Sequence, residues 1–179
     1  MSQLISLRVP EELDDSLFFP KEVIYLKKEE YQGWIGLGEF KVFSYELLYY
    51  SGENAYLPWN DGEKHIPELF EKWKLIKGNC ELLFSERNAG QALEPMKEGI
   101  GLFLSAVYWL HGKPVQLKAW KKQIEECTLK PVNLVERLSF IMERPAFFHS
   151  FRQLCELFVE LEKHFVRYSI QKSKKGLSN

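Results

Sequence analysis

The sequence predicts an all-α protein, a single helical bundle of about five to six helices with an irregular N-terminal arm. Apolar residues recur every three to four positions through most of residues 36–172, and no run alternates apolar and polar residues for long enough to force a strand. A length of 179 residues suits one compact domain. We therefore expect an irregular arm over 1–35, a helical bundle domain over 36–172 and a frayed polar tail over 173–179.

Composition is that of an ordinary globular protein, with 45% hydrophobic and 27% charged residues, and the 15% of aromatic residues predicts a core rich in ring packing. The net charge of −1 gives no overall attraction to nucleic acid or to anionic lipid. However, residues 1–110 carry 11 Lys+Arg against 18 Asp+Glu (net −7), whereas residues 111–179 carry 13 against 7 (net +6). The two halves either attract each other within the fold, or the basic half meets an acidic partner or a phosphate backbone.

Three widely spaced cysteines, Cys80, Cys127 and Cys155, fall at apolar positions of predicted helices. Buried thiols in a reducing compartment are therefore expected rather than disulfides, and their spacing does not fit a zinc site. The acidic N-terminal sequence does not resemble a signal peptide, and the longest apolar run, residues 99–112, is too short to span a bilayer. We expect a cytoplasmic protein with no metal, no cofactor and no membrane association.

The first elements in the chain are the arm and a short helix. Pro10 and Pro20 interrupt the arm, whose apolar patches SLFFP and VIYL indicate an irregular, partly extended segment laid across the body. Helix-spaced aromatic and leucine residues predict a helix over 39–52, with a glycine cap at its end. The Gly-, Asn- and Asp-rich loop that follows contains Trp59, which we expect to hold the loop against the body.

Two long helices come next, over 66–88 and 94–112. Gly78 lies inside the first, and we expect it to permit close packing of a neighbour. Gly99 and Gly101 lie inside the second, where we expect another backbone to approach. Apolar residues nearly encircle the second helix, as is typical of the central helix of a bundle.

Three further helices complete the chain: a short one over 117–127, one that follows Pro131, and one that opens at Pro145. The last carries apolar residues at intervals of four and three, a heptad seam formed by Phe147, Phe151, Leu154, Phe158, Leu161, Phe165 and Tyr168. This seam packs either into its own bundle or against another copy of the chain, so a homo-oligomer remains an alternative.

The stretch KPVNLVERLSFIMERPAFFH over residues 130–149 places polar residues between apolar ones. Asn133-x-x-Glu136 fits a capping box, in which the Asn133 side chain accepts a hydrogen bond from the Glu136 amide and the Glu136 carboxylate accepts one from the Asn133 amide. Arg137, one position further on, is expected to point toward a carboxylate of a neighbouring helix or toward a bound anion.

Arg144-Pro145 indicates a break between two helices, because proline fits the first position of a new helix and not the interior of a continuous one. His149 lies one turn beyond this corner. Arg-x4-His is the spacing found in HEPN-type helical ribonucleases, in which the arginine would hold a phosphate and the histidine would act as acid or base. Those proteins usually have a polar residue after the arginine, where this chain has Pro145, and a histidine with a structural role at a helix junction is the competing interpretation.

Several segments resemble the YpoC-like family of small proteins from Bacillus-type bacteria. They cover most of residues 57–163 and read LPW, IPELFEKWK, ALEPMKEGI, YWLHGKPV, KPVNLVERLSFI and RPAFFHSFRQLCELFVELEK. The resemblance implies a helical cytoplasmic protein and supplies no enzymatic activity to carry over. The family commonly has asparagine where this chain has His111, which puts a shared role for that position in doubt.

We expect a non-enzymatic binding or adaptor protein with an unidentified protein partner. Turn-rich, aromatic and charged residues gather at the ends of helices whose interiors look structural. The binding residues predicted on this basis are Trp59, Trp109, His111, Lys130, Asn133, Arg137, Arg144 and His149. The alternative is an RNA-binding or RNA-cleaving domain centred on Arg144 and His149, and a small-ligand pocket inside the aromatic core is a third hypothesis that the sequence does not decide.

Overall fold

The structure, a computed structural model, describes residues 3–177. Six α-helices dominate the described residues and pack into one bundle, which confirms the predicted fold class. The α-helices are α1 (Ser44–Tyr50), α2 (Gly62–Ser85), α3 (Ala89–Leu110), α4 (Trp120–Glu126), α5 (Leu134–Glu143) and α6 (Phe148–Leu177). Two short strands, β1 (Leu4–Arg8) and β2 (Val23–Lys27), and three 3-10 helices at Glu11–Leu13, Lys28–Tyr31 and Pro58–Asp61 make up the rest.

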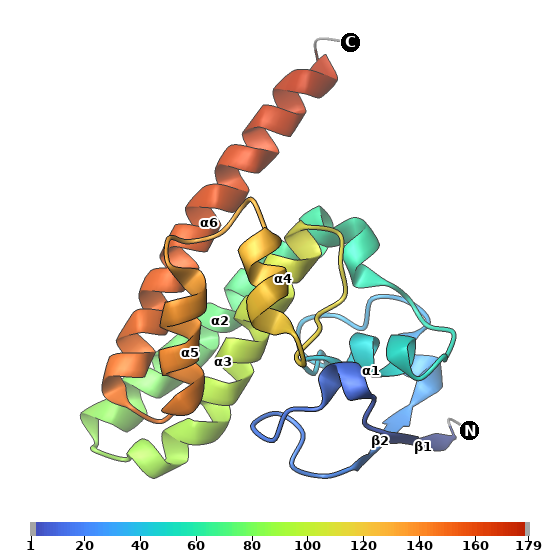
Figure 1. The fold of residues 1–179 in the computed structure, drawn as a ribbon, viewed down its shortest axis with the longest axis horizontal. Helices are drawn as coiled ribbons and strands as arrows, with labels where there is room; N and C mark the ends of the chain where they lie inside the picture. Colours follow the sequence, from blue (N-terminus) through green and yellow to red (C-terminus); the bar gives the residue numbers. More distant parts are fainter. Residues whose placement is uncertain (1–2, 178–179) are drawn as a thin grey trace.

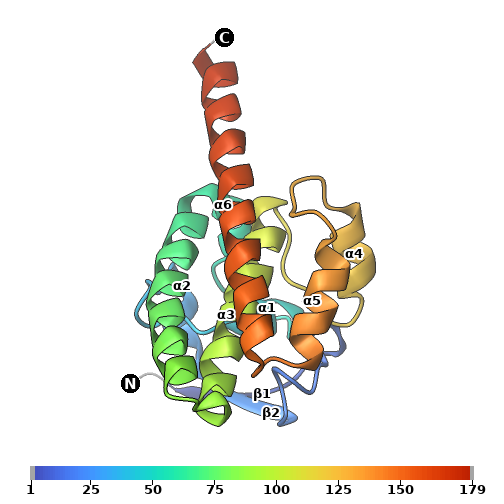
Figure 2. The same cartoon turned by 90° about the vertical axis from the view of Figure 1, so that its left-hand side faces the viewer.

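Helices α2, α3 and α6 form the core of the bundle, with α5 beside α6 and α4 beside α5 (Figures 1 and 2). Aromatic rings join them, as the composition predicts. The indole of Trp73 on α2 stacks on Phe158 of α6 with ring centres 4.5 Å apart, and Phe103 of α3 meets the same ring edge-on at 5.3 Å. Every residue of α3 from Gly99 to Leu110 is buried, so α3 is the central helix of the bundle.

The N-terminal arm is more regular than we expected. β1 and β2 pair in antiparallel register, from Leu4 opposite Lys27 to Arg8 opposite Val23. Leu7 and Leu26 are the buried residues of the two strands. Each strand is only five residues long, so its alternation is too brief to be recognised in the sequence, and the partner strand supplies the hydrogen bonds that stabilise it.

Phe43 attaches the arm to the bundle. Its ring is buried and meets Phe18 edge-on at 5.0 Å and Phe19 at 6.2 Å. The backbone of Phe43 has a φ of 66°, a left-handed conformation that a bulky residue rarely adopts. Packing in the core therefore outweighs a local backbone cost of about 1–3 kcal/mol at this position.

Two predictions about helix ends are wrong. Asn133 has a φ of 54°, and its side chain makes no capping hydrogen bond, so the capping box with Glu136 does not form. Asparagine tolerates the left-handed region better than most residues, and this property explains its position. Pro145 does not open α6, because α5 ends at Glu143 and α6 begins at Phe148.

Residues 144–147 form a turn instead of the first turn of a helix, and the Ser150 hydroxyl donates a 2.6 Å hydrogen bond to the carbonyl oxygen of Arg144. At the other end, α6 continues as helix through residues 173–177, which we expected to fray. Residues 178–179 of the predicted tail lie outside the described residues.

The glycines of α2 and α3 also differ from expectation. A Cβ atom placed on Gly78 would meet nothing within 4 Å, so no neighbour packs closely there. On Gly99 it would lie 2.5 Å from the Trp73 ring, and on Gly101 it would lie 2.9 Å from the Val42 side chain. Glycine is therefore needed at these two positions because side chains, and not another backbone, pack closely against them.

Candidate functional site

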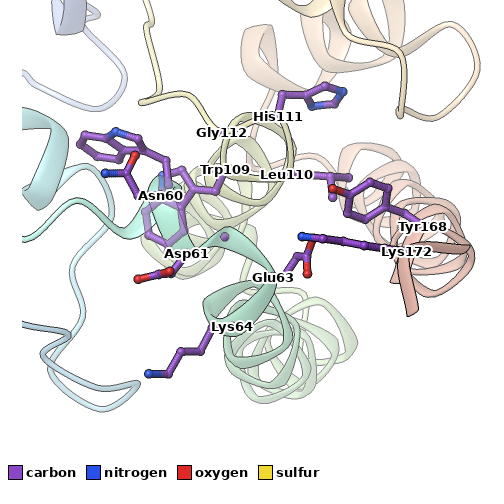
Figure 3. A pocket seen from close by; sticks show the side chains of 12 residues that line it. Asn60, Asp61, Glu63, Lys64, Trp109, Leu110, His111, Gly112, Tyr168 and Lys172 are labelled. Carbon is purple, nitrogen blue, oxygen red and sulfur yellow. The ribbon is translucent and has the colours of Figure 1, made fainter. Parts of the chain in front are cut away.

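One pocket, of about 540 Å³, lies at the end of the bundle where α2 begins, α3 ends and α6 passes (Figure 3). Trp59, Trp109 and His111, three of the predicted binding residues, are among the residues that line it. Across the pocket, the Lys172 ammonium of α6 donates a 2.6 Å hydrogen bond to the Glu63 carboxylate of α2. An ion pair therefore joins the α2 and α6 sides of the pocket.

The two tryptophans at this end belong to the core. Trp59 is 5% exposed and meets Tyr49 edge-on at 5.3 Å, which holds its loop against the body as expected. Trp109 is 1% exposed, and its indole Nε1 donates a 2.8 Å hydrogen bond to Oε1 of Glu46. Neither ring offers a face to a partner, so their burial supports a structural role.

Both nitrogens of His111 are engaged by backbone groups. Nδ1 lies 2.7 Å from the Val107 carbonyl oxygen and donates to it, while Nε2 accepts a 3.2 Å hydrogen bond from the Leu129 amide. This arrangement requires a neutral imidazole, and burial lowers the pKa of His111. The side chain ties the end of α3 to the loop before α5.

Lys130 also has a local structural role. Its ammonium donates to the carbonyl oxygens of Glu125 and Cys127 at the end of α4, so it caps that helix. Contacts within the fold therefore account for the positions of four predicted residues: Trp59, Trp109, His111 and Lys130.

A shallow groove of about 280 Å³ between α5 and α6 brings three other predicted residues together. Asn133, Arg137 and His149 line it with Glu136, Phe140 and Gln153. The His149 ring is exposed and meets Phe140 edge-on, with ring centres 5.4 Å apart. Three of the predicted residues from the stretch 130–149 therefore lie together in this groove.

Arg137 is committed to contacts within the protein. Its Nη1 and Nη2 donate to both carboxylate oxygens of Glu160 at 3.1 and 2.9 Å, and its Nε donates to Gln153 at 3.2 Å. Nη1 also donates to the Val132 carbonyl oxygen at 3.2 Å. Arg137 therefore clamps α5 to α6, in line with the expected carboxylate contact, and four of its five N–H donors are used within the protein.

We predict that Arg137→Ala lowers the free energy of unfolding by about 2 kcal/mol, because it removes a bidentate, partly buried pair and leaves Glu160 without its partner. Arg144→Ala is the matched control and should cost no more than about 1 kcal/mol, since Arg144 is exposed. Urea denaturation followed by tryptophan fluorescence measures both. Equal losses from the two variants would contradict the clamp.

Arg144 does not join His149 in the groove. Its guanidinium lies 5.2 Å from the centre of the Phe147 ring at the corner between α5 and α6, and Arg144 is not among the residues that line the groove. The pairing of a phosphate-holding arginine with an acid–base histidine, which the RNA-cleaving alternative needs, therefore has no support from this geometry.

A buried carboxylate was missed by the sequence analysis. Glu46 of α1 is 0% exposed; its Oε1 accepts from Trp109 and, at 3.3 Å, from the Val115 amide. Its Oε2 has no hydrogen-bond partner. Burial raises the pKa of Glu46 to about 7, while the hydrogen bond from Trp109 acts in the opposite direction. The available signal was a single acidic residue in the otherwise apolar helix FSYELLYY.

An apolar stripe on the outside of α6 was also missed. Phe148, Val159, Val166, Ile170 and Leu177 are each about half exposed or more. The last four are 7, 4 and 7 residues apart, which places them within about 40° of one another on the helix. These five residues, the outer stripe, face away from the buried seam of the same helix. Their spacing could be recognised in the sequence, but the longer heptad seam of the same helix is the more prominent pattern.

The three cysteines are free thiols, as expected. Burial raises the pKa of Cys80 and of Cys155 to about 11. Within residues 3–177, no group of three or more His, Cys, Asp or Glu side chains is placed to hold a metal ion. None of the helices described is both long enough and apolar enough to cross a membrane.

Comparison with known proteins gives two matches. A family model described as YpoC-like protein matches residues 63–173. A protein of Bacillus subtilis (strain 168), described as uncharacterized protein YpoC, is 38% identical over 113 residues, which are 63% of this chain and 69% of the relative. No solved structure matches the chain. The matched region begins in the first turn of α2 and takes in most of the bundle, including the outer stripe as far as Ile170.

Proposed function

Since this chain belongs to the YpoC-like family through most of α2–α6, we propose that its function resides in this bundle, as a non-enzymatic module that binds a partner protein along the outer stripe of α6. The observation that carries the proposal is the second apolar face of α6. Its inner face packs Phe151, Phe158 and Phe165 into the bundle, while each side chain of the outer stripe is about half exposed or more. Exposed large apolar side chains that share one face of a helix are typical of interaction surfaces.

The contacts of the other predicted residues give them structural roles, so the proposed binding surface does not depend on these residues. His111, Lys130 and Arg137 are held by hydrogen bonds within the protein, and Trp59 and Trp109 are buried. Exposed aromatic rings continue the outer stripe around the corner to Phe147, which is 49% exposed and carries the Arg144 guanidinium over its ring. Aromatic and arginine side chains are enriched at the centres of protein interfaces.

We propose that the protein resides in the cytoplasm. Three free thiols, two of them buried, are compatible with a reducing compartment.

Site-specific photocrosslinking in the native cell tests the proposal. We expect a benzoylphenylalanine in place of Val166 or Ile170 to form discrete protein adducts. The matched control is the same residue in place of Leu75, which is 73% exposed on α2 and lies off the stripe. Adducts from Leu75 that equal those from the stripe, or a stripe that yields none, would refute a binding role for this face.

A further inference from the structure

The outer stripe also indicates what kind of partner it receives. We infer that the occupant is an amphipathic helix of another protein, with carboxylates along one border of its own apolar stripe. This inference rests on the proposed function and specifies the chemistry of its partner.

The width of the stripe favours a single helix. Val159, Val166, Ile170 and Leu177 form a row about 40° wide, as in the narrow seam of a two-helix contact. A helix that lies in a membrane surface, or that faces a broad protein core, presents an apolar face of about 100° or more.

Beyond residue 162, the border of the stripe is basic on one side, whereas nearer the start of α6 the same side carries Glu156. Lys163, Arg167 and Lys174 lie at about 40–80° from the centre of the stripe. Among the described residues, none of these three has an ion-pair partner. Over the whole segment 163–177 there are five Lys or Arg residues and no Asp or Glu. A partner with carboxylates opposite these three cations would gain three pairs, whereas a neutral partner would gain none.

This charge argues against a second copy of the chain as the occupant. Two α6 helices that paired through their outer stripes beyond residue 162 would bring together five Lys or Arg residues from each copy with no Asp or Glu, and like charges at such a contact repel. Nucleic acid would satisfy the cations, but a phosphate backbone would leave Val166 and Ile170 in water. An acidic amphipathic helix satisfies both features of the surface.

The position of the stripe makes it accessible. The C-terminal turns of α6 extend beyond the rest of the molecule in both views (Figures 1 and 2). The Lys172–Glu63 pair joins it to the start of α2 where it leaves the body. Lys172 lies on the side of α6 opposite the stripe, since it is 13 residues beyond Val159. The attachment therefore leaves the stripe facing outward.

Binding of designed helices to the full chain tests the inference. The probes are three-heptad synthetic peptides with leucine at their a and d positions and either glutamate or lysine at e and g, and fluorescence anisotropy measures their affinity. We expect the glutamate peptide to bind at least about tenfold more tightly than the lysine peptide, with an affinity that falls as salt is added.

Two sets of variants separate the apolar and the charged contributions. Val166→Ser with Ile170→Ser should abolish binding of the glutamate peptide. Lys163→Glu, Arg167→Glu and Lys174→Glu together should reverse the preference toward the lysine peptide. The matched control changes three exposed cations away from the stripe, Lys41→Glu, Lys113→Glu and Lys122→Glu, and should leave the preference unchanged. Helical circular dichroism and the urea midpoint confirm that each variant is folded.

The contrary outcomes are distinct. A concentration-dependent dimer that Val166→Ser dissociates would make a second copy the occupant. Binding of a DNA or RNA oligonucleotide, or of phosphatidylglycerol vesicles, that depends on the three cations and not on Val166 or Ile170 would identify a phosphate ligand, and either result overturns the inference. Protein adducts from Val166 without any preference between the two peptides would leave the proposed function standing and refute the acidic helix alone.

Discussion

Replacing Gly62 by alanine is expected to lower the free energy of unfolding by about 3 kcal/mol, and the same replacement at Gly78 is expected to raise it by about 0.5–1 kcal/mol. Both glycines lie in α2. A Cβ atom on Gly62 would lie 2.3 Å from the Trp109 carbonyl oxygen, which is backbone and cannot move aside cheaply. At Gly78 there is open space, so alanine simply lowers the conformational entropy of the unfolded chain.

Urea denaturation of the two variants and the wild-type chain measures this difference in sign. Gly78→Ala serves as the control for helix propensity, because the chemical change and the helix are the same. Two variants that shift the midpoint in the same direction would show that the start of α2 does not press against the last turn of α3.

Replacing Glu46 by glutamine is expected to stabilise the protein at pH 8, by up to about 3 kcal/mol, and to change its stability little below about pH 4.5. Glutamine has nearly the shape of glutamate and keeps an oxygen for Trp109 and Val115, but it carries no charge. The gain comes from removing the cost of a carboxylate that is 0% exposed and has one oxygen without a partner.

The pH dependence follows from the direction of the pKa shift. The pKa of Glu46 is about 7 in the folded protein against an ordinary value of 4.5, so the native state binds more protons than the unfolded state between these values. The contribution of Glu46 to stability is therefore fully present below about pH 4.5 and is lost as the pH rises through about 7. Burial lowers the pKa of His65 and of His111, and these groups act in the opposite direction, because their neutral forms are favoured and acid destabilises them.

Urea denaturation at several pH values between 4 and 9 measures this effect as the difference between wild type and Glu46→Gln. Glu125→Gln is the control for the loss of a carboxyl, because Glu125 is an exposed residue of α4. A difference between Glu46→Gln and wild type that does not vary with pH would contradict the assignment of a proton to Glu46.

Periodicity in the sequence was sufficient to predict the helical bundle. The apolar residues of α2, α3 and α6 recur at helical spacing, and burial in the structure follows that spacing, as at Trp73, Phe103 and Phe158. The hairpin of β1 and β2 could not be predicted in the same way, since its strands are defined by their pairing across the chain and not by local pattern. The conformation of Asn133 was misread for a related reason: asparagine suits both a cap and a left-handed turn, and the surrounding packing selects between them.

The predicted site divides into parts for a geometric reason. Trp59, just before α2, and His111, just after α3, meet at one end of the bundle. Arg144 lies at the corner where α5 turns back into α6 (Figure 2). Residues at successive turns of a helical protein alternate between its two ends, so closeness in a list of turns does not imply closeness in space. Asn133, Arg137 and His149 form a second group, because α5 and α6 lie side by side.

The unbroken length of α6 has a mechanical consequence. A helix of 30 residues extends about 45 Å, and α6 contacts the rest of the bundle from its start as far as Lys172, which pairs with Glu63 of α2. A partner bound to the C-terminal end of α6 is therefore held at a fixed distance and angle from the hairpin of β1 and β2, because the helix is rigid. A flexible tether of the same length would fix neither quantity.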